Sequence, residues 1–151
     1  MKSRRRSNTT PPDPVFFVDR NLGADDMPTA LRAVGFALVV HDDHFNKRQD
    51  VLDPEVIRVC GEQNWFLLTG DSDLTRRWST EIIAANIGVF CQTNNHHGPA
   101  LWCPRICGLK AEIISLAQKQ AKPFIAFITA DVKSQLLLKV DWPPFASREP
   151  T

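Results

Sequence analysis

The sequence predicts an α/β protein whose mostly parallel sheet is covered by helices on both faces. Short apolar runs without polar alternation, such as Val15–Val18 and Trp65–Thr69, are typical of strands buried on two sides. Segments with apolar residues at helical spacing separate these runs. The resulting order is βαβαβαβαββ, and we expect the last two strands, joined by a short turn, to add an antiparallel edge. The predicted strands are Val15–Val18, Phe36–Val40, Trp65–Thr69, Ile87–Cys91, Phe124–Thr129 and Gln135–Val140.

The helices between these strands carry start and stop signals. Gly35 is placed to end the first helix, and Asp53 followed by Pro54 forms an N-cap with proline at the first helical position. The remaining helices follow from apolar residues at helical spacing. The predicted helices run from Asp25 or Asp26 to about Val34, from Asp53 to about Gln63, from Leu74 or Ser79 to Ala85, and from Pro104 or Arg105 to about Gln120.

We expect one domain between two short tails. The 151 residues are 43% hydrophobic and 23% charged, which is enough apolar material for a single core. Residues 1–14, MKSRRRSNTTPPDP, are basic, polar and rich in proline, so they predict a disordered tail. The domain then covers 15–142, and 143–151 form a short C-terminal tail after the last strand.

Charge and hydropathy exclude several classes of protein. No apolar run approaches the roughly 18–20 residues that span a bilayer, and no apolar segment follows the basic start as in a secretory signal. We therefore expect a cytoplasmic protein with no membrane partner, and free thiols at its four cysteines. The net charge is +1, with +3 in residues 1–14 and −2 in the rest. Attraction to nucleic acid must come from the tail or a local patch, with or without a metal ion.

Acidic residues follow three of the predicted strands, at the edge where function gathers in parallel sheets. Asp19 ends the first strand, His41-Asp42-Asp43 ends the second, and Asp71 and Asp73 follow the third. Asp53 starts the helix that leads into the third strand, so it belongs to the same edge. The alternative for each acid is a solvated turn residue or, for Asp53, an N-cap alone.

Carboxylates that converge on one edge call for a neutralising cation. Ligands made only of oxygen select a hard ion, Mg²⁺ or Mn²⁺, which can activate water and neutralise a phosphodiester during hydrolysis. The glycine-rich phosphate loops GxGxxG and GxxxxGK[ST] are both missing from the sequence, which disfavours nucleotide binding of the Rossmann or P-loop kind.

Several segments resemble the PIN-like domains of VapC-type toxins, which are small ribonucleases of prokaryotic toxin–antitoxin systems. These segments are PVFFVDRNLG, ALRAVGFALVVHDDHF, the stretch from DPE to WFLLTGD, and PFIAFIT. The resemblance covers residues 15–140. It implies a PIN-like three-layer α/β/α fold and RNA cleavage that depends on Mg²⁺ or Mn²⁺.

The resemblance also implies which acids do the chemistry. Asp19 matches the first metal-binding acid, Asp53 the acid at a helix start, and Asp71 the acid of a T-x-D motif. Asp19 and Asp71 would hold the ion, while Asp53 or Glu55 would complete its shell or orient the attacking water. Asp73 is a further candidate ligand, at a position where related sequences often carry a basic residue.

Basic residues near the acids are candidates for binding RNA. Arg76 and Arg77 follow the acidic turn and can clamp phosphates, although they also suit a solvated helix start. His41 and His44 are expected to touch RNA or tune the acids, or else to be ordinary polar residues at a strand end. Gly70 stands where the family often has Lys or Arg, and we expect this replacement to weaken contact with phosphate and to affect rate or substrate preference.

Other groups of residues are weaker candidates for a functional site. His96 and His97 precede Cys103 and Cys107, but their spacing is irregular for a zinc site, and the cysteines straddle the predicted helix start. A Cys–His nucleophilic pair has no supporting acid. Four tryptophans can stack on bases, but we expect them to pack in the protein instead. These are Trp65, Trp78, Trp102 and Trp142.

The sequence therefore favours a metal-dependent endoribonuclease acting as a toxin. Its partners would be RNA, a cognate antitoxin that inserts an Arg among the acids, and a second copy of the chain in a homodimer. The alternative is a catalytically inactive PIN-like module that binds RNA or protein. A small-molecule phosphohydrolase is disfavoured, because Asn21 stands where such an enzyme has the second Asp of an Asp-x-Asp start.

Overall fold

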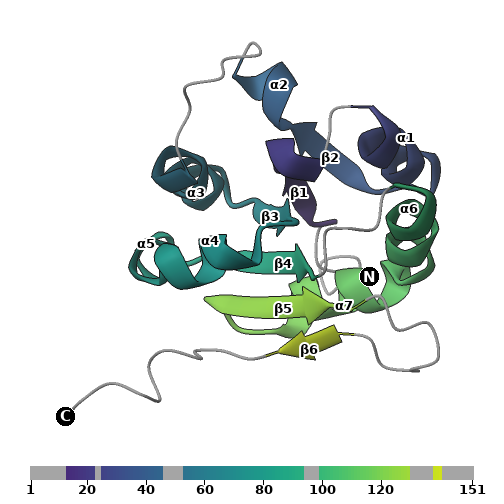
Figure 1. Ribbon diagram of the computed structural model, residues 1–151. Helices are drawn as coiled ribbons and strands as arrows, with labels where there is room; N and C mark the ends of the chain where they lie inside the picture. The colour runs from purple at the N-terminus through teal and green to yellow at the C-terminus, as the bar shows by residue number, and fades with distance from the viewer. Residues whose placement is uncertain (1–12, 23–24, 46–52, 94–98, 130–137, 141–151) are drawn as a thin grey trace, which may run out of the picture.

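A single sheet with helices on both faces forms the centre of the fold (Figure 1). The computed structural model describes residues 13–22, 25–45, 53–93, 99–129 and 138–140. Within these residues six strands are ordered β2-β1-β3-β4-β5-β6. Their bounds are β1 Val15–Val18, β2 Ala37–Val40, β3 Phe66–Thr69, β4 Gly88–Gln92, β5 Phe124–Ile128 and β6 Leu138–Val140.

The strands from β1 to β5 all run parallel, which confirms the predicted mostly parallel sheet. β6 lies beside β5 and runs antiparallel to it, with Leu138 opposite Ile128. It covers the last three residues of the predicted strand, whose first three residues lie outside the described residues, as does the predicted turn at 130–134. So do the two predicted tails, apart from Asp13 and Pro14.

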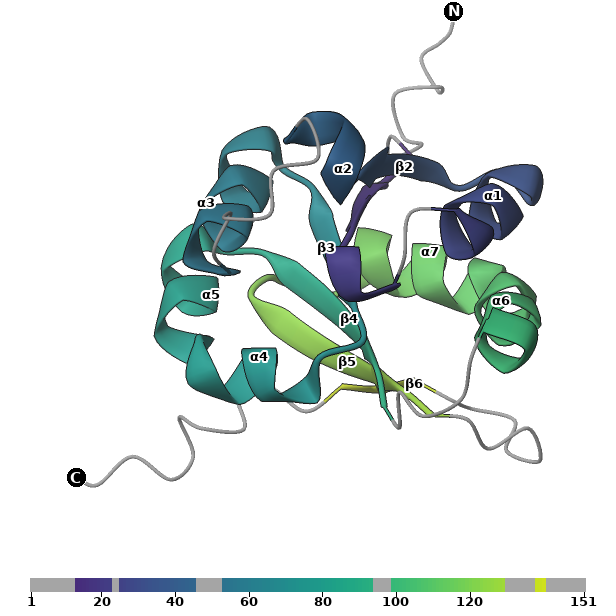
Figure 2. The same ribbon diagram turned by 45° about the horizontal axis from the view of Figure 1, so that its top comes forward.

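The helices form two layers, one on each side of the sheet (Figure 2). Leu31, Ile106 and Ile113 pack from α1, α6 and α7 on one face, and Ile57 and Ile82 pack from α3 and α5 on the other. The fold is thus the expected three-layer α/β/α arrangement. The helices are η2 Arg20–Leu22 (3-10), α1 Asp26–Ala33, α2 His41–His44, α3 Asp53–Gln63, α4 Ser72–Arg77, α5 Ser79–Ala85, α6 Pro99–Gly108 and α7 Lys110–Lys119.

Alternation of side chains along each strand divides the core into these two layers. Phe16 and Val18 of β1 face the α1/α6/α7 side, whereas Phe17 between them faces the α3/α5 side. In β3, Phe66 and Leu67 divide in the same way. Because both sides of the sheet are covered, the strands consist of continuous apolar residues.

The prediction that β2 is a buried strand is wrong. Ala37 is exposed, Leu38 and Val39 are half-buried, and only Val40 is buried. β2 lies at the edge of the sheet and pairs with β1 alone. An edge strand has a neighbour on one side only, so an apolar run does not by itself reveal how deeply the strand lies.

The helical boundaries also differ from the prediction. The last predicted helix is two helices, α6 and α7, and α6 begins at Pro99 with Pro104 in its interior. The third predicted helix is likewise divided into α4 and α5 at Trp78. His41–His44, expected as polar residues following a strand, forms one helical turn. None of the described helices is long and apolar enough to cross a membrane.

Candidate acidic site

The carboxyl ends of β1 and β3 adjoin where the strand order reverses. The chain passes from β1 to β2 on one side and later enters β3 on the other side of β1. In open parallel sheets such a switch point leaves a crevice at the carboxyl ends of the strands, where ligands bind. Asp19 follows β1 at this point, and Thr69 is the last residue of β3.

Asp19 is buried and hydrogen-bonded through both carboxylate oxygens. Its side chain is 7% exposed. The hydroxyl of Thr69 donates to Oδ2 at 2.8 Å, and the backbone N–H of Arg20 donates to Oδ1 at 2.7 Å. Burial raises the pKa of Asp19 above its ordinary value, these hydrogen bonds oppose the rise, and the charge of Asp53 adds to it. A cation beside Asp19 would compensate this buried charge.

Thr69 and Asn21 tie the segments after β1 and β3 together. Thr69 Oγ1 donates to Asp19 and also accepts the backbone N–H of Asp71 at 3.1 Å. Asn21 Oδ1 accepts the backbone N–H of Gly70 at 3.1 Å. Sequence reasoning assigned no role to Thr69 and noted Asn21 only as a missing acid. Thr69 is the single polar residue of the otherwise apolar strand FLLT, and this polar strand end could have marked it as a site residue.

The charges of Asp53 and Asp71 act on the same neighbourhood as Asp19. Asp53 begins α3 and is half-buried, and its charge raises the pKa of Asp19. Burial raises the pKa of Cys91 on β4 to about 12, and the charges of Asp71 and Asp19 contribute to that rise. The three predicted catalytic acids thus act electrostatically on one small region at the carboxyl edge of the sheet.

Two predicted ligands are engaged in other contacts. Asp71 caps α4, where its Oδ1 accepts the backbone N–H of Asp73 at 3.0 Å. Asp73 is exposed and forms an ion pair with Arg76. Glu55 lies half-buried in the first turn of α3. In the part of the chain that the structure describes, no group of three or more His, Cys, Asp or Glu is arranged to hold a metal ion.

The carboxylates of the site would suit a hard divalent ion that needs few protein ligands. Mg²⁺ is usually held by one or two carboxylates, with water and substrate phosphate completing its shell. Asp19 is such a carboxylate, and Asp53, whose charge acts on it, would be the second; a cation would offset the burial of Asp19 and the repulsion from Asp53. The donor set therefore fits Mg²⁺ or Mn²⁺ better than an ion that needs a complete protein cage.

The predicted substrate residues are placed differently from one another. Arg77 is exposed, whereas Arg76 is held by Asp73. His41 is buried, with its ring 4.9 Å from that of Phe45, and its charge lowers the pKa of Asp19. His44 is exposed and lies edge-on to Phe45, with ring centroids 4.6 Å apart. His41 therefore acts on Asp19, and His44 lies at the surface.

Gln92, at the end of β4, was missed by sequence reasoning. It is 2% exposed and lies next to Cys91, whose pKa responds to Asp71 and Asp19. The fourth strand carries no acid at its end, so the sequence offered no candidate residue there. The available signal was a polar residue, Gln92, directly after an apolar run.

The other predicted constellations are separate from this site. Cys103 and Cys107 both lie inside α6, so the prediction that they straddle a helix start is wrong. Trp102 is 1% exposed, which confirms that it packs in the core. Trp65 and Trp78 are partly buried and pack against the core on the α3/α5 side. His96, His97 and Trp142 lie outside the described residues.

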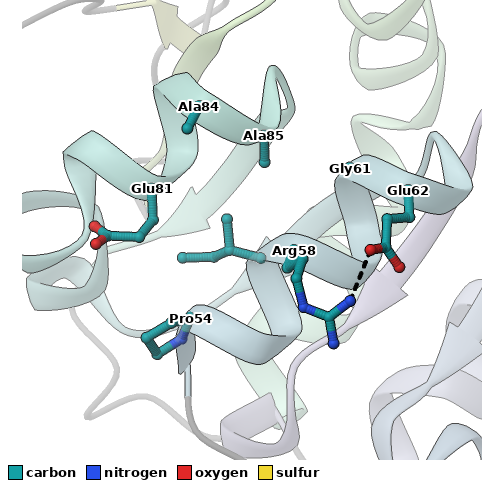
Figure 3. A pocket seen from close by; sticks show the side chains of 8 residues that line it. Pro54, Arg58, Gly61, Glu62, Glu81, Ala84 and Ala85 are labelled. Atoms are coloured by element: carbon teal, nitrogen blue, oxygen red, sulfur yellow. Dashed lines mark hydrogen bonds and ion pairs between the residues drawn. The ribbon is translucent and has the colours of Figure 1, made fainter.

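A groove between α3 and α5 contains none of the candidate acids (Figure 3). Its volume is about 540 Å³, and its lining is mostly apolar. Arg58 and Glu62 form an exposed ion pair at its rim, 2.7 Å apart. Gly61 of α3 and Ala85 of α5, both labelled in Figure 3, line the groove where the two helices approach most closely, since a Cβ at Gly61 would lie 2.8 Å from the Ala85 carbonyl oxygen.

The fold and the position of Asp19 define a three-layer α/β domain with a candidate acidic site at the carboxyl edge of its parallel sheet. The family described as PIN like domain matches residues 14–94 through its sequence model. This match spans more than half of the chain and includes Asp19, Asp53 and Asp71. The chain belongs to the PIN-like domain family. No curated protein and no solved structure matches it.

Proposed function

We propose that the chain is a metal-dependent endoribonuclease that hydrolyses RNA phosphodiesters and serves as the toxin of a toxin–antitoxin pair. The proposal rests above all on buried Asp19, which Thr69 holds at the switch point of a parallel sheet. The charges of Asp53 and Asp71 act on the same region. A buried carboxylate on which the charge of a further acid acts is a costly arrangement that a metal site would explain.

Asp19 and Asp53 are the residues that would hold Mg²⁺ or Mn²⁺, with Asp71 or Glu55 as a further oxygen donor. When bound, such an ion supplies an activated water and neutralises charge on the phosphate. Thr69 fixes one oxygen of Asp19 and leaves its remaining lone pairs for the ion. Asp71 accepts the N–H of Asp73 through Oδ1, so its Oδ2 could serve as the oxygen donor while the cap of α4 is kept.

Basic residues after the acidic turn would bind the RNA backbone. Arg77 is exposed and available for a phosphate. Arg76 would exchange its exposed ion pair with Asp73 for a substrate phosphate, an exchange of low cost because exposed ion pairs contribute about 0–1 kcal/mol. The buried His41, whose charge lowers the pKa of Asp19, would tune the charge of that carboxylate.

The proposed toxin would be held inactive by an antitoxin that covers the crevice. An Arg of the antitoxin would pair with Asp19 and Asp53 and occupy the place of the cation. We also propose that a second copy of the chain is a partner, in a homodimer.

A catalytically inactive PIN-like module that binds RNA or protein is the second candidate. It is favoured by one observation: no three acids of the described residues are arranged together as ligands. In such a module, Asp71 would remain a helix cap and Asp73 the partner of Arg76.

Cleavage of total RNA and of a structured transfer RNA separates these candidates. The purified protein is assayed with Mg²⁺, with Mn²⁺ and with EDTA, beside Asp19→Asn and Asp71→Asn. Glu62→Gln is the control, because this exposed residue pairs with Arg58 on α3. Metal-dependent cleavage that is lost in Asp19→Asn and kept in the control supports the nuclease. RNA binding without cleavage under every condition supports the inactive module.

A further inference from the structure

Two sulfur atoms meet where α1 packs against α6, on the face of the sheet opposite α3 and α5, and a second cysteine of α6 contacts α1 beside them. Met27 of α1 is 3% exposed, and Cys103 and Cys107 of α6 are half-buried. The thiol of Cys103 donates to Sδ of Met27, with the two sulfurs 4.0 Å apart. Figures 1 and 2 show the two helices side by side.

The two cysteines occupy one face of α6. Residues four apart on a helix are neighbours on its surface. Burial raises the pKa of Cys103, and the charges of Cys107 and of Asp26 on α1 raise it further. The thiol of Cys107 donates to the carbonyl of Ala30 on α1, with 3.4 Å between sulfur and oxygen. Both thiols therefore contact α1, and the charge of Cys107 acts on Cys103.

We propose that Met27, Cys103 and Cys107 form a three-coordinate site for a soft monovalent cation, Cu⁺. Thiolate and thioether sulfurs are soft ligands, and they select Cu⁺ over hard ions. Two sulfurs bound to one ion at about 2.3 Å, with about 120° between the bonds, lie about 4.0 Å apart. The separation of Cys103 and Met27 already has this value.

Zinc suits this cluster less well. A structural zinc ion takes four ligands from Cys, His, Asp or Glu. The cluster supplies two cysteines, and no group of three or more such residues is arranged for a metal anywhere in the described ranges. Two thiolates and a thioether complete a three-coordinate site and leave a four-coordinate site unfinished.

Binding involves no change of oxidation state. The thiols of Cys103 and Cys107 each lose one proton to solvent, each thiolate forms one bond to Cu⁺, and the thioether of Met27 donates an electron pair. The hydrogen bonds from the two thiols to Met27 and Ala30 are lost. The ion would join α1 to α6 by coordinate bonds.

The test is an anaerobic titration of the whole chain with Cu⁺, in competition with bicinchoninate. We expect one Cu⁺ per chain and X-ray absorption showing three sulfur neighbours at about 2.3 Å. In Met27→Leu we expect two sulfur neighbours and an affinity lower by about tenfold, which corresponds to about 1.4 kcal/mol. The double variant Cys103→Ser with Cys107→Ser should lose the ion. Cys60→Ala, a buried cysteine in the opposite layer, is the control that should bind as the parent does.

Three results would overturn the proposal. The first is a parent protein that retains no Cu⁺ against bicinchoninate. The second is an absorption spectrum dominated by nitrogen or oxygen neighbours. The third is unchanged affinity in the double serine variant. The first two measurements use the parent protein alone, so they remain decisive if a variant fails to fold.

Discussion

Thr69 makes the hydrogen bonds that join Asp19 to the segment carrying Asp71. Its hydroxyl both donates to Asp19 and accepts the backbone N–H of Asp71, at 2.8 and 3.1 Å. Thr69→Val keeps the shape but leaves a buried carboxylate oxygen without its donor, so we expect a loss of about 1–3 kcal/mol in the free energy of unfolding. RNA cleavage should fall as well. Urea denaturation and the cleavage assay measure the two effects.

Two further variants serve as controls for Thr69→Val. Thr69→Ser keeps the hydroxyl and should restore most of both properties. Thr80→Val makes the same chemical change at an exposed position on α5, where we expect an effect within about 0.5 kcal/mol. If Thr69→Val proved as mild as Thr80→Val, the hydroxyl would have no structural role at the crevice.

The four cysteines should differ sharply in reactivity. Burial raises the pKa of Cys60 and of Cys91 to about 12, so neither provides thiolate at neutral pH. Cys103 and Cys107 are half-buried. With Ellman's reagent we expect two thiols to react in the native chain and all four in denaturant. Cys107→Ser should lower the native count by one and Cys60→Ala should not. A native count of four would contradict the burial of β4.

At the scale of elements, α3 approaches α5 closely at Gly61. A methyl group added there would lie 2.8 Å from the carbonyl oxygen of Ala85, a backbone atom that cannot turn away. We expect Gly61→Ala to lower the free energy of unfolding by about 1–3 kcal/mol through overpacking. RNA cleavage should also fall, because α3 carries Asp53.

Gly108→Ala is the matched control for this helix contact. Nothing lies within 4 Å of a methyl group at that position in α6, so the change should be neutral or stabilising by up to about 1 kcal/mol. Thermal unfolding of both variants measures the difference. A Gly61→Ala chain as stable as the parent would mean that α3 and α5 separate easily.

At the scale of the whole molecule, a bound cation should stabilise the fold. A ligand at 100 times its dissociation constant adds about 2.7 kcal/mol, which raises Tm by about 5–10 °C for a chain of this size. We expect Mg²⁺ or Mn²⁺ to raise Tm in the parent and EDTA to reverse the rise. Asp19→Asn should show no rise. An equal rise in this variant would place the ion elsewhere.

Much of the fold could be predicted from local sequence patterns. The continuous apolar runs predicted parallel strands buried on both faces, because each strand must present Phe16 to one helical layer and Phe17 to the other. Asp53 with Pro54 predicted the start of α3. The edge position of β2 could not be predicted, because strand order depends on contacts between segments far apart in the chain.

The sequence by itself determined the α/β order, the placement of Asp19 and Asp71 at strand ends, and the family. These features follow from periodicity and from residues close together in the chain. Only the tertiary structure decided that Thr69 bridges Asp19 and Asp71 and that Met27 meets Cys103. The bridge and the sulfur contact join residues 50 and 76 positions apart. Packing of whole elements brings such residues together, and no local pattern records it.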